Sequence, residues 1–278
     1  MALGGNPVFR GKNFKSAVAT APSVPPSPYA APMTAEQLDE LYRAPSAGPA
    51  QTGRITYDDV IVKTLVCLCA VVVGAVITLS VPPAVALGLT LVGALGGFVL
   101  GLVNSFKREP SPALVLAYAA LEGLFLGGLT LLLDRVAPGI GLQAVLGTFA
   151  VAGVTLFLYR SGKVRATPGL AKFFLIAVVG YLAFSVVNLF LMLFGVVQNP
   201  WGLRGITVFG IPLGVAIGLL AVVLAAISLI FDFNSIEQAV KAGAPRRVAW
   251  TAAFGLTVTL VWLYTEILRV LAIVNSND

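Results

Sequence analysis

Hydrophobic residues along this chain form seven long runs, which are separated by short stretches rich in polar residues, Gly and Pro. The runs cover approximately residues 60–80, 84–105, 113–133, 142–160, 172–196, 210–231 and 248–274. A helix needs about 20 residues to cross the ~30 Å hydrocarbon core of a bilayer, and each run has roughly this length. The pattern therefore predicts an all-α polytopic membrane protein, built as a bundle of seven transmembrane helices.

The first 53 residues do not follow this pattern. The stretch "ATAPSVPPSPYAAPMTAEQ" is rich in Pro, Ala and Ser, and such a composition does not bury a core. It also lacks the basic and then apolar layout of a signal peptide. We expect two parts: a disordered cytoplasmic tail over residues 1–53 and a seven-helix transmembrane domain over residues 54–278. Thr56 is expected to cap the first helix, with Asp58 and Asp59 in its first turn.

Basic residues are distributed unequally between the two ends of the predicted bundle. With seven spans, the tail and the C-terminus lie on opposite sides of the membrane. On the tail's side are four basic residues of the tail itself and Arg54, Lys107, Arg108, Arg160, Lys163, Arg165, Lys172, Lys241, Arg246 and Arg247. The other side has Arg135 and Arg204, with Arg269 near the end of the last run. The positive-inside rule predicts a cytoplasmic N-terminus and a C-terminus on the opposite side.

Composition supports the membrane assignment and excludes several functions. Hydrophobic residues make up 58% of the chain and charged residues only 11%, whereas soluble domains carry about a quarter charged residues. The net charge of +6 is explained by the cytoplasmic loops and does not indicate nucleic-acid binding. The chain has no His, which excludes Ser-His-Asp triads, H-E-x-x-H zinc sites and haem-ligating His. Cys67 and Cys69 are interpreted as packing residues.

Three acidic residues in or next to the predicted spans are the candidate functional residues. Glu122 lies about nine residues into the third run, roughly 14 Å deep, where a charge costs about 2.5–3.5 kcal/mol. Glu266 lies in the last run, and Arg269 follows one turn later, so an i,i+3 ion pair is possible. Asp232 ends the sixth run and is expected at the cytoplasmic boundary, with Glu237 on a solvated helical extension. Each acid has a structural alternative: a neutral hydrogen-bonded group for Glu122, a neutral pair with Arg269 for Glu266, and an interfacial carboxylate for Asp232.

Carboxylates held close together in a low-dielectric interior titrate as a coupled group. Such a cluster binds a cation when it is ionised and releases it when it is protonated. This chemistry offers a pH-gated cation pathway without histidine. Glu122, Asp232 and Glu266 are the predicted ion-binding and gating residues and the candidate calcium ligands, with Arg269 as the electrostatic partner.

Three stretches carry a family resemblance: "LEGLFLGG" in the third run, "LIFDFNSIEQ" at the end of the sixth, and "LYTEILRVL" in the last, where Glu266 replaces the Asp of an "LYLD" pattern. With them, residues 54–274 resemble the Bax-inhibitor family of seven-helix membrane proteins, particularly a bacterial branch with a long N-terminal tail. The resemblance implies an integral protein of the bacterial plasma membrane that acts as a pH-sensitive calcium leak. It also implies a gating pair on the last two helices, here Asp232 and Glu266.

The spacing of this pair departs from the family pattern. The two acids are 34 residues apart, and a turn at residues 243–245 places them at depths that differ by roughly 13 Å. A direct hydrogen bond between them is therefore not expected. Depth alone pairs Glu266 better with Glu122, and the pairing is left open.

Two functions are favoured, and a proton-coupled transporter also stays open, although no internal repeat or pair of broken helices is evident. The first is a leak for calcium or for a proton-coupled cation. The second is a regulatory membrane protein that transports nothing and binds a membrane protease or a stress-response complex. An enzyme is not expected, because intramembrane serine and zinc proteases use His and no Gly-x-Gly-Asp segment of an aspartyl protease is present. The expected partners are the lipid bilayer, calcium or protons, and other membrane proteins, with no covalent cofactor and no nucleic acid.

Overall fold

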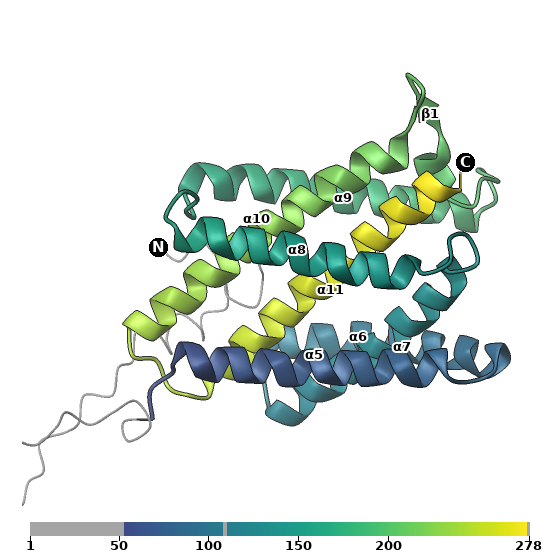
Figure 1. The fold of residues 1–278 in the computed structure, drawn as a ribbon. Coiled ribbons are helices and arrows are strands. Elements are labelled where there is room, and N and C mark those ends of the chain that lie inside the picture. Colours follow the sequence, from purple (N-terminus) through teal and green to yellow (C-terminus); the bar gives the residue numbers. More distant parts are fainter. Residues whose placement is uncertain (1–52, 108–109, 277–278) are drawn as a thin grey trace, which may run out of the picture.

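The computed structural model describes residues 53–107 and 110–276, so the predicted tail over residues 1–53 lies almost wholly outside the described part. Seven long helices fill the described residues (Figure 1). They are α5 (Tyr57–Leu79), α6 (Pro83–Phe106), α7 (Pro112–Leu133), α8 (Ile140–Arg160), α9 (Pro168–Leu193), α10 (Leu213–Lys241) and α11 (Val248–Asn275). Each is long and apolar enough to cross a membrane, which confirms the predicted seven-helix transmembrane bundle.

The helices begin where local sequence favours it. Thr56 caps α5 as predicted, because its hydroxyl accepts a hydrogen bond of 3.1 Å from the backbone amide of Asp59. Ser111 and Thr167 cap α7 and α9 in the same way. A Pro occupies the first position of α6, α7 and α9, where its missing amide hydrogen costs no helical hydrogen bond.

The sixth helix continues beyond its hydrophobic run, as the predicted helical extension with Glu237 requires. Hydrophobicity falls after residue 231, but α10 continues to Lys241. The polar continuation is stabilised by side-chain partners: Glu237 accepts hydrogen bonds from Tyr159 of α8 and from Lys241, and forms an ion pair with Arg165 at 3.3 Å. Asp232, at the end of the hydrophobic run, therefore does not end the helix. It lies inside α10, nine residues before its end.

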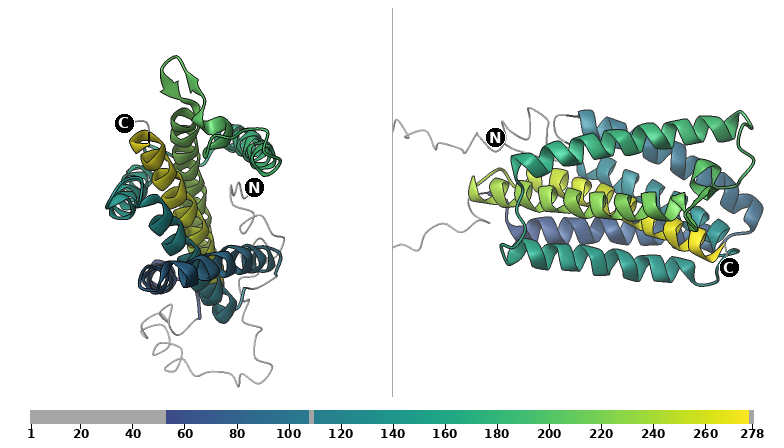
Figure 2. Two further views of the ribbon diagram at one scale, coloured as in Figure 1. Left: turned by 90° about the vertical axis from the view of Figure 1, so that its right-hand side faces the viewer. Right: turned by 90° about the horizontal axis from the view of Figure 1, so that it is seen from above.

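Helix α11 is the centre of the bundle. It packs against α5 and α7 on one side and against α8 and α10 on the other. Figure 2 shows α5, α6 and α7 grouped together, with α10 and α11 crossing the middle of the molecule. Helix α6 contacts mainly α7, and α9 is peripheral, packing against α10 and the short 3₁₀ helix η1 (Gly202–Gly205). The candidate acids Asp232 and Glu266 thus belong to the two most buried helices.

The loop between α9 and α10 carries the only strands in the described residues. After η1 it forms a small antiparallel hairpin of β1 (Thr207–Val208) and β2 (Ile211–Pro212), which projects from the bundle (Figure 1). The hairpin was not predicted, but it does not alter the all-helical membrane domain.

Helices α5 and α7 approach each other closely through two glycines. A Cβ atom added to Gly123 would lie 2.2 Å from the carbonyl oxygen of Val71, and one added to Gly74 would lie 2.4 Å from that of Ala120. Small residues at such contacts let two backbones pack directly in a membrane. The two glycines therefore bring the backbones of α5 and α7 together, beside the buried side chains that the helices also share.

The segment before α5 is joined to the turn between α10 and α11. The amide of Ile55 donates to the carbonyl of Ala244 at 2.8 Å, and the amide of Arg246 donates to that of Gly53 at 2.8 Å. The Arg246 guanidinium also pairs with Asp59 at 2.7 Å. These contacts form a clamp between residues 53–55 and 244–246.

The end of the bundle that contains this clamp is called the basic end, and the opposite end is called the far end. Because consecutive helices alternate in direction, the described residues of the basic end include Arg54, Lys107, Arg160, Lys163, Arg165, Lys172, Lys241, Arg246 and Arg247. Asn275 lies at the far end. That the basic end faces the cytoplasm stays a prediction.

Candidate functional site

Asp232 is a buried and only half-satisfied carboxylate. Its side chain is 0% exposed and faces α11, where Thr259 donates a hydrogen bond of 2.7 Å to Oδ2. The Thr259 hydroxyl also lies 3.4 Å from that of Ser228, one turn before Asp232 on α10. The second carboxylate oxygen, Oδ1, has no hydrogen-bond partner among the described residues. A carboxylate oxygen without a donor in a buried place is unstable as an anion, so it favours a proton or a cation.

Glu266 lies on the same central helix, α11, and is 2% exposed. Nη1 of Arg269 donates to both of its carboxylate oxygens, at 2.7 and 2.8 Å, which confirms the predicted i,i+3 pair. The hydroxyl of Tyr181, on α9, donates to Oε1. Glu266 is therefore neutralised and fully hydrogen-bonded, in contrast to Asp232.

A second arginine reaches Glu266 from the loop between α9 and α10. Gly202 begins η1 in the left-handed region, with a φ of +61°. A Cβ atom there would lie 2.3 Å from Oδ1 of Asn188. The same oxygen accepts a hydrogen bond of 2.6 Å from the amide of Leu203, which ties η1 to α9. Arg204 is thereby directed into the bundle and is only 6% exposed.

Of the two terminal nitrogens of the Arg204 guanidinium, only Nη2 donates hydrogen bonds within the described residues. Its Nη2 donates to the hydroxyls of Tyr181 at 3.2 Å and Ser185 at 2.9 Å. Its Nη1 lies 3.9 Å from Oε2 of Glu266, which is too far for a hydrogen bond, and has no other partner among the described residues. Together, Tyr181, Ser185, Arg204, Glu266 and Arg269 form what we call the far-end cluster.

Sequence reasoning named Glu266 and Arg269 but missed the other three members of the far-end cluster. Tyr181 and Ser185 are common residues in a long apolar helix and give no signal. Arg204 did offer one, because it is one of two basic residues in the loops of the side where the positive-inside rule expects few. An arginine in that position needs a local reason, and its burial supplies one.

Asp232 and Glu266 do not meet. Asp232 bonds to Thr259, which is seven residues before Glu266 on α11, or about 10 Å along the helix axis. Trp262 lies between these two levels, packing near Phe231 and 6.2 Å from the Tyr181 ring. The structure thus agrees with the prediction that the two acids share no direct hydrogen bond.

Glu122 lies apart from both. It is partly buried on α7 and faces α6, since a Cβ added to Gly97 would lie 2.9 Å from its Oε1. Its other neighbour is Tyr118, one turn earlier on the same helix. Pairing Glu266 with Glu122 on the basis of depth is therefore wrong: equal depth does not bring together side chains that point to different neighbouring helices.

The three acids do not form one metal site. Glu122 faces α6, Asp232 faces Thr259 of α11, and Glu266 faces the arginines and Tyr181. Within residues 53–107 and 110–276, no group of three His, Cys, Asp or Glu residues could hold a metal ion. A calcium ion bound jointly by Glu122, Asp232 and Glu266 has no place in this arrangement, because the helices that carry them present them to separate surroundings.

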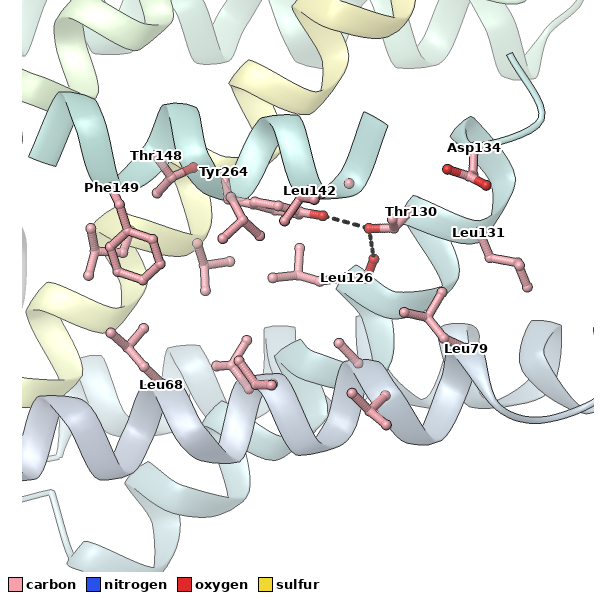
Figure 3. Close-up of a pocket in the computed structure, with 18 of the residues that line it drawn as sticks. Leu68, Leu79, Leu126, Thr130, Leu131, Asp134, Leu142, Thr148, Phe149 and Tyr264 are labelled. Atoms are coloured by element: carbon pink, nitrogen blue, oxygen red, sulfur yellow. Dashed lines mark hydrogen bonds between the residues drawn. The ribbon is translucent and has the colours of Figure 1, made fainter. Parts of the chain in front are cut away.

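Two cavities border the central helix α11. One, of about 460 Å³, lies between α9, η1 and α11 and is lined by the far-end cluster. The other, of about 490 Å³, lies between α5, α7, α8 and α11 and is almost entirely apolar. Figure 3 shows one polar contact in it: the Thr130 hydroxyl donates to the carbonyl of Leu126 and accepts from Tyr264 at 2.7 Å. Its one acid, Asp134, bonds to the amide of Gly139.

Comparison with known proteins assigns the family. No curated protein matches the sequence closely enough to count as a relative. A family model described as Bax inhibitor 1 like matches residues 6–276, nearly the whole chain. The match agrees with the seven membrane-spanning helices and with the resemblance carried by the segments around Glu122, Asp232 and Glu266. The chain is therefore an integral membrane protein that belongs to the Bax inhibitor 1 like family.

Proposed function

We propose that this protein is a pH-sensitive cation leak, with calcium as the cation, in which Asp232 binds and releases the proton. The observation that carries the proposal is the burial of Asp232 between α10 and α11 with one carboxylate oxygen unpartnered among the described residues. An acid in such a place within a membrane span is costly unless it has a function or a partner.

The chemistry of a half-satisfied carboxylate supports a proton-controlled site. Thr259 stabilises one oxygen of Asp232 in either protonation state, and the other oxygen remains free to accept a proton or to contact a cation. The ionised form attracts a cation through its charge, and the protonated form does not. Acidification therefore converts a cation-attracting site into a neutral one.

The surroundings of Asp232 correspond to a closed state of the leak. Toward the far end, the Trp262 side chain occupies the face of α11 between Thr259 and Glu266. Beyond it, Arg204 and Arg269 oppose the passage of a cation, and among the described residues Glu266 is the acid that pairs with both. Opening would require Trp262 and the far-end cluster to move, so that a cation could reach Asp232 between α10 and α11.

Flux measurements on the purified protein in liposomes test the proposal. Calcium flux is expected to fall as the pH is lowered, because protonation removes the negative charge of Asp232. Asp232→Asn cannot titrate, so its flux should lose this pH dependence. Asp134→Asn is the matched control, since it makes the same change in an exposed residue at the far end and should retain the wild-type profile.

Two outcomes would contradict the proposal. An unchanged pH profile in Asp232→Asn would remove that residue from the mechanism. A wild-type protein with no calcium or proton leak at any pH would reject transport altogether. If a membrane protease or a stress-response protein co-purified with such an inactive chain, the non-transporting regulatory function would replace the leak.

A further inference from the structure

The cavity of the far-end cluster has an excess of positive charge. Its volume is about 460 Å³, and its charged lining residues are Arg204, Arg269 and Glu266. Two guanidinium groups thus face one carboxylate. Arg269 forms hydrogen bonds with both oxygens of Glu266, whereas Arg204 approaches this carboxylate only to 3.9 Å, so within the described residues one negative charge is shared by two guanidinium groups.

The geometry of Arg204 leaves a donor group free for a ligand. Nη2 donates hydrogen bonds to Tyr181 and Ser185. Nη1 donates none within the described residues, although Arg204 is only 6% exposed. A buried guanidinium donor without an acceptor costs more than an ordinary missing hydrogen bond. Oxyanions match such a donor well, because arginine binds them through short, charge-assisted hydrogen bonds.

We propose that this cavity binds a phosphate group through Arg204, with Arg269 and the hydroxyls of Tyr181 and Ser185 contributing to the polar wall. The phosphate is either the free ion or part of a lipid headgroup. The lining also includes the apolar side chains of Leu182, Leu189 and Met192 on α9, which would contact the glycerol and acyl part of a lipid. The site does not include Asp232, and its tests measure binding rather than flux, so their outcome is separate from that of the flux measurements.

Binding of inorganic phosphate to the full chain in detergent tests the free-ion source. Phosphate should raise the unfolding temperature saturably, whereas chloride at the same ionic strength should not. Arg204→Gln should weaken phosphate binding by about tenfold or more, the effect of losing a charge-assisted hydrogen bond. Arg135→Gln is the matched control, because Arg135 is an exposed arginine at the same end of the bundle and should bind phosphate as the wild type does.

Lipid retention tests the headgroup source. The delipidated protein is incubated with phosphatidylglycerol, and the bound lipid is counted by native mass spectrometry. If the wild type and Arg135→Gln retain a lipid that Arg204→Gln loses, while free phosphate has no effect, the ligand is a lipid phosphate. Failure of the wild type to bind either phosphate source, or equal losses in the two arginine variants, would overturn the proposal.

Glu266→Gln provides a second variant in case Arg204→Gln does not fold. The amide still accepts a hydrogen bond from Tyr181, but the negative charge that competes for the arginines is gone. Affinity for the phosphate source should therefore increase, the opposite of the effect of Arg204→Gln. Unchanged or weaker binding in a folded Glu266→Gln protein would reject an anion site governed by these charges.

Discussion

At the scale of single residues, one hydroxyl connects the three charged groups of the far-end cluster. The Tyr181 oxygen donates to Glu266 and accepts hydrogen bonds of 3.2 Å from both Arg204 and Arg269. Its ring belongs to α9, whereas its partners belong to η1 and α11. Helix α9 has few other contacts with the bundle. The hydroxyl is therefore a principal connection between α9 and the centre of the molecule.

We expect Tyr181→Phe to destabilise the protein by ~2 kcal/mol, because hydrogen bonds to charged groups are worth more than neutral ones. Tyr264→Phe should cost less, about 1 kcal/mol, since it removes a single bond between two neutral hydroxyls, that of Tyr264 and Thr130 (Figure 3). Denaturant unfolding of both variants in the same detergent measures the difference. A larger loss in Tyr264→Phe would contradict this role of the charged cluster.

The sequence predicts the site well where one helix determines the geometry. The Glu266–Arg269 pair follows from a three-residue spacing on a helix, and the structure contains it. The burial of Asp232 and the isolation of Glu122 depend on which neighbouring helix each side chain faces, and residue spacing carries no such information. Arg204 reaches the site from a loop, so no helical periodicity could place it there.

At the scale of helices, the α5–α7 contact depends on the absence of side chains at Gly74 and Gly123. Gly123→Ala should destabilise the protein by about 1–3 kcal/mol, because the new methyl group would lie against the backbone of α5 and push the helices apart. Thermal unfolding in detergent measures the loss.

Gly153→Ala on α8 is the control for this substitution. No atom lies within 4 Å of a Cβ at Gly153, and Ala is the better helix former, so this variant should be as stable as the wild type or slightly more stable. Equal destabilisation by the two substitutions would show that helix contact is not what Gly123 provides.

All seven helices could be predicted from the sequence because each must bury a long apolar segment in lipid. An extension of α10 that carries Glu237 was also expected, but the residue at which it ends was not, because hydrophobicity reports contact with lipid and not where a helix stops. Its last turns carry polar residues, and they are stabilised as helix by the hydrogen bonds that Glu237 accepts from Tyr159 and Lys241. The same limit applies to η1, whose position depends on the Asn188 side chain of a neighbouring helix.

At the scale of the whole molecule, the charge distribution predicts the orientation in the membrane. A fluorescent protein fused after Gly162, at the basic end, should be fluorescent, because green fluorescent protein matures in the cytoplasm but not after export through the general secretion pathway. Alkaline phosphatase fused after the last residue should be active, because it requires export. The rule that basic residues stay in the cytoplasm gives both expectations. The reverse result for both fusions would invert the assigned topology.

The clamp at the basic end has a mechanical consequence. Residues 53–55 are hydrogen-bonded to the turn that joins α10 to α11, and these two helices hold Asp232 and Glu266. Tension on the 52 residues that precede the clamp is therefore transmitted directly to that turn, as well as to the start of α5. A force applied at residue 53 would thus reach the acid-bearing pair of helices from the basic end.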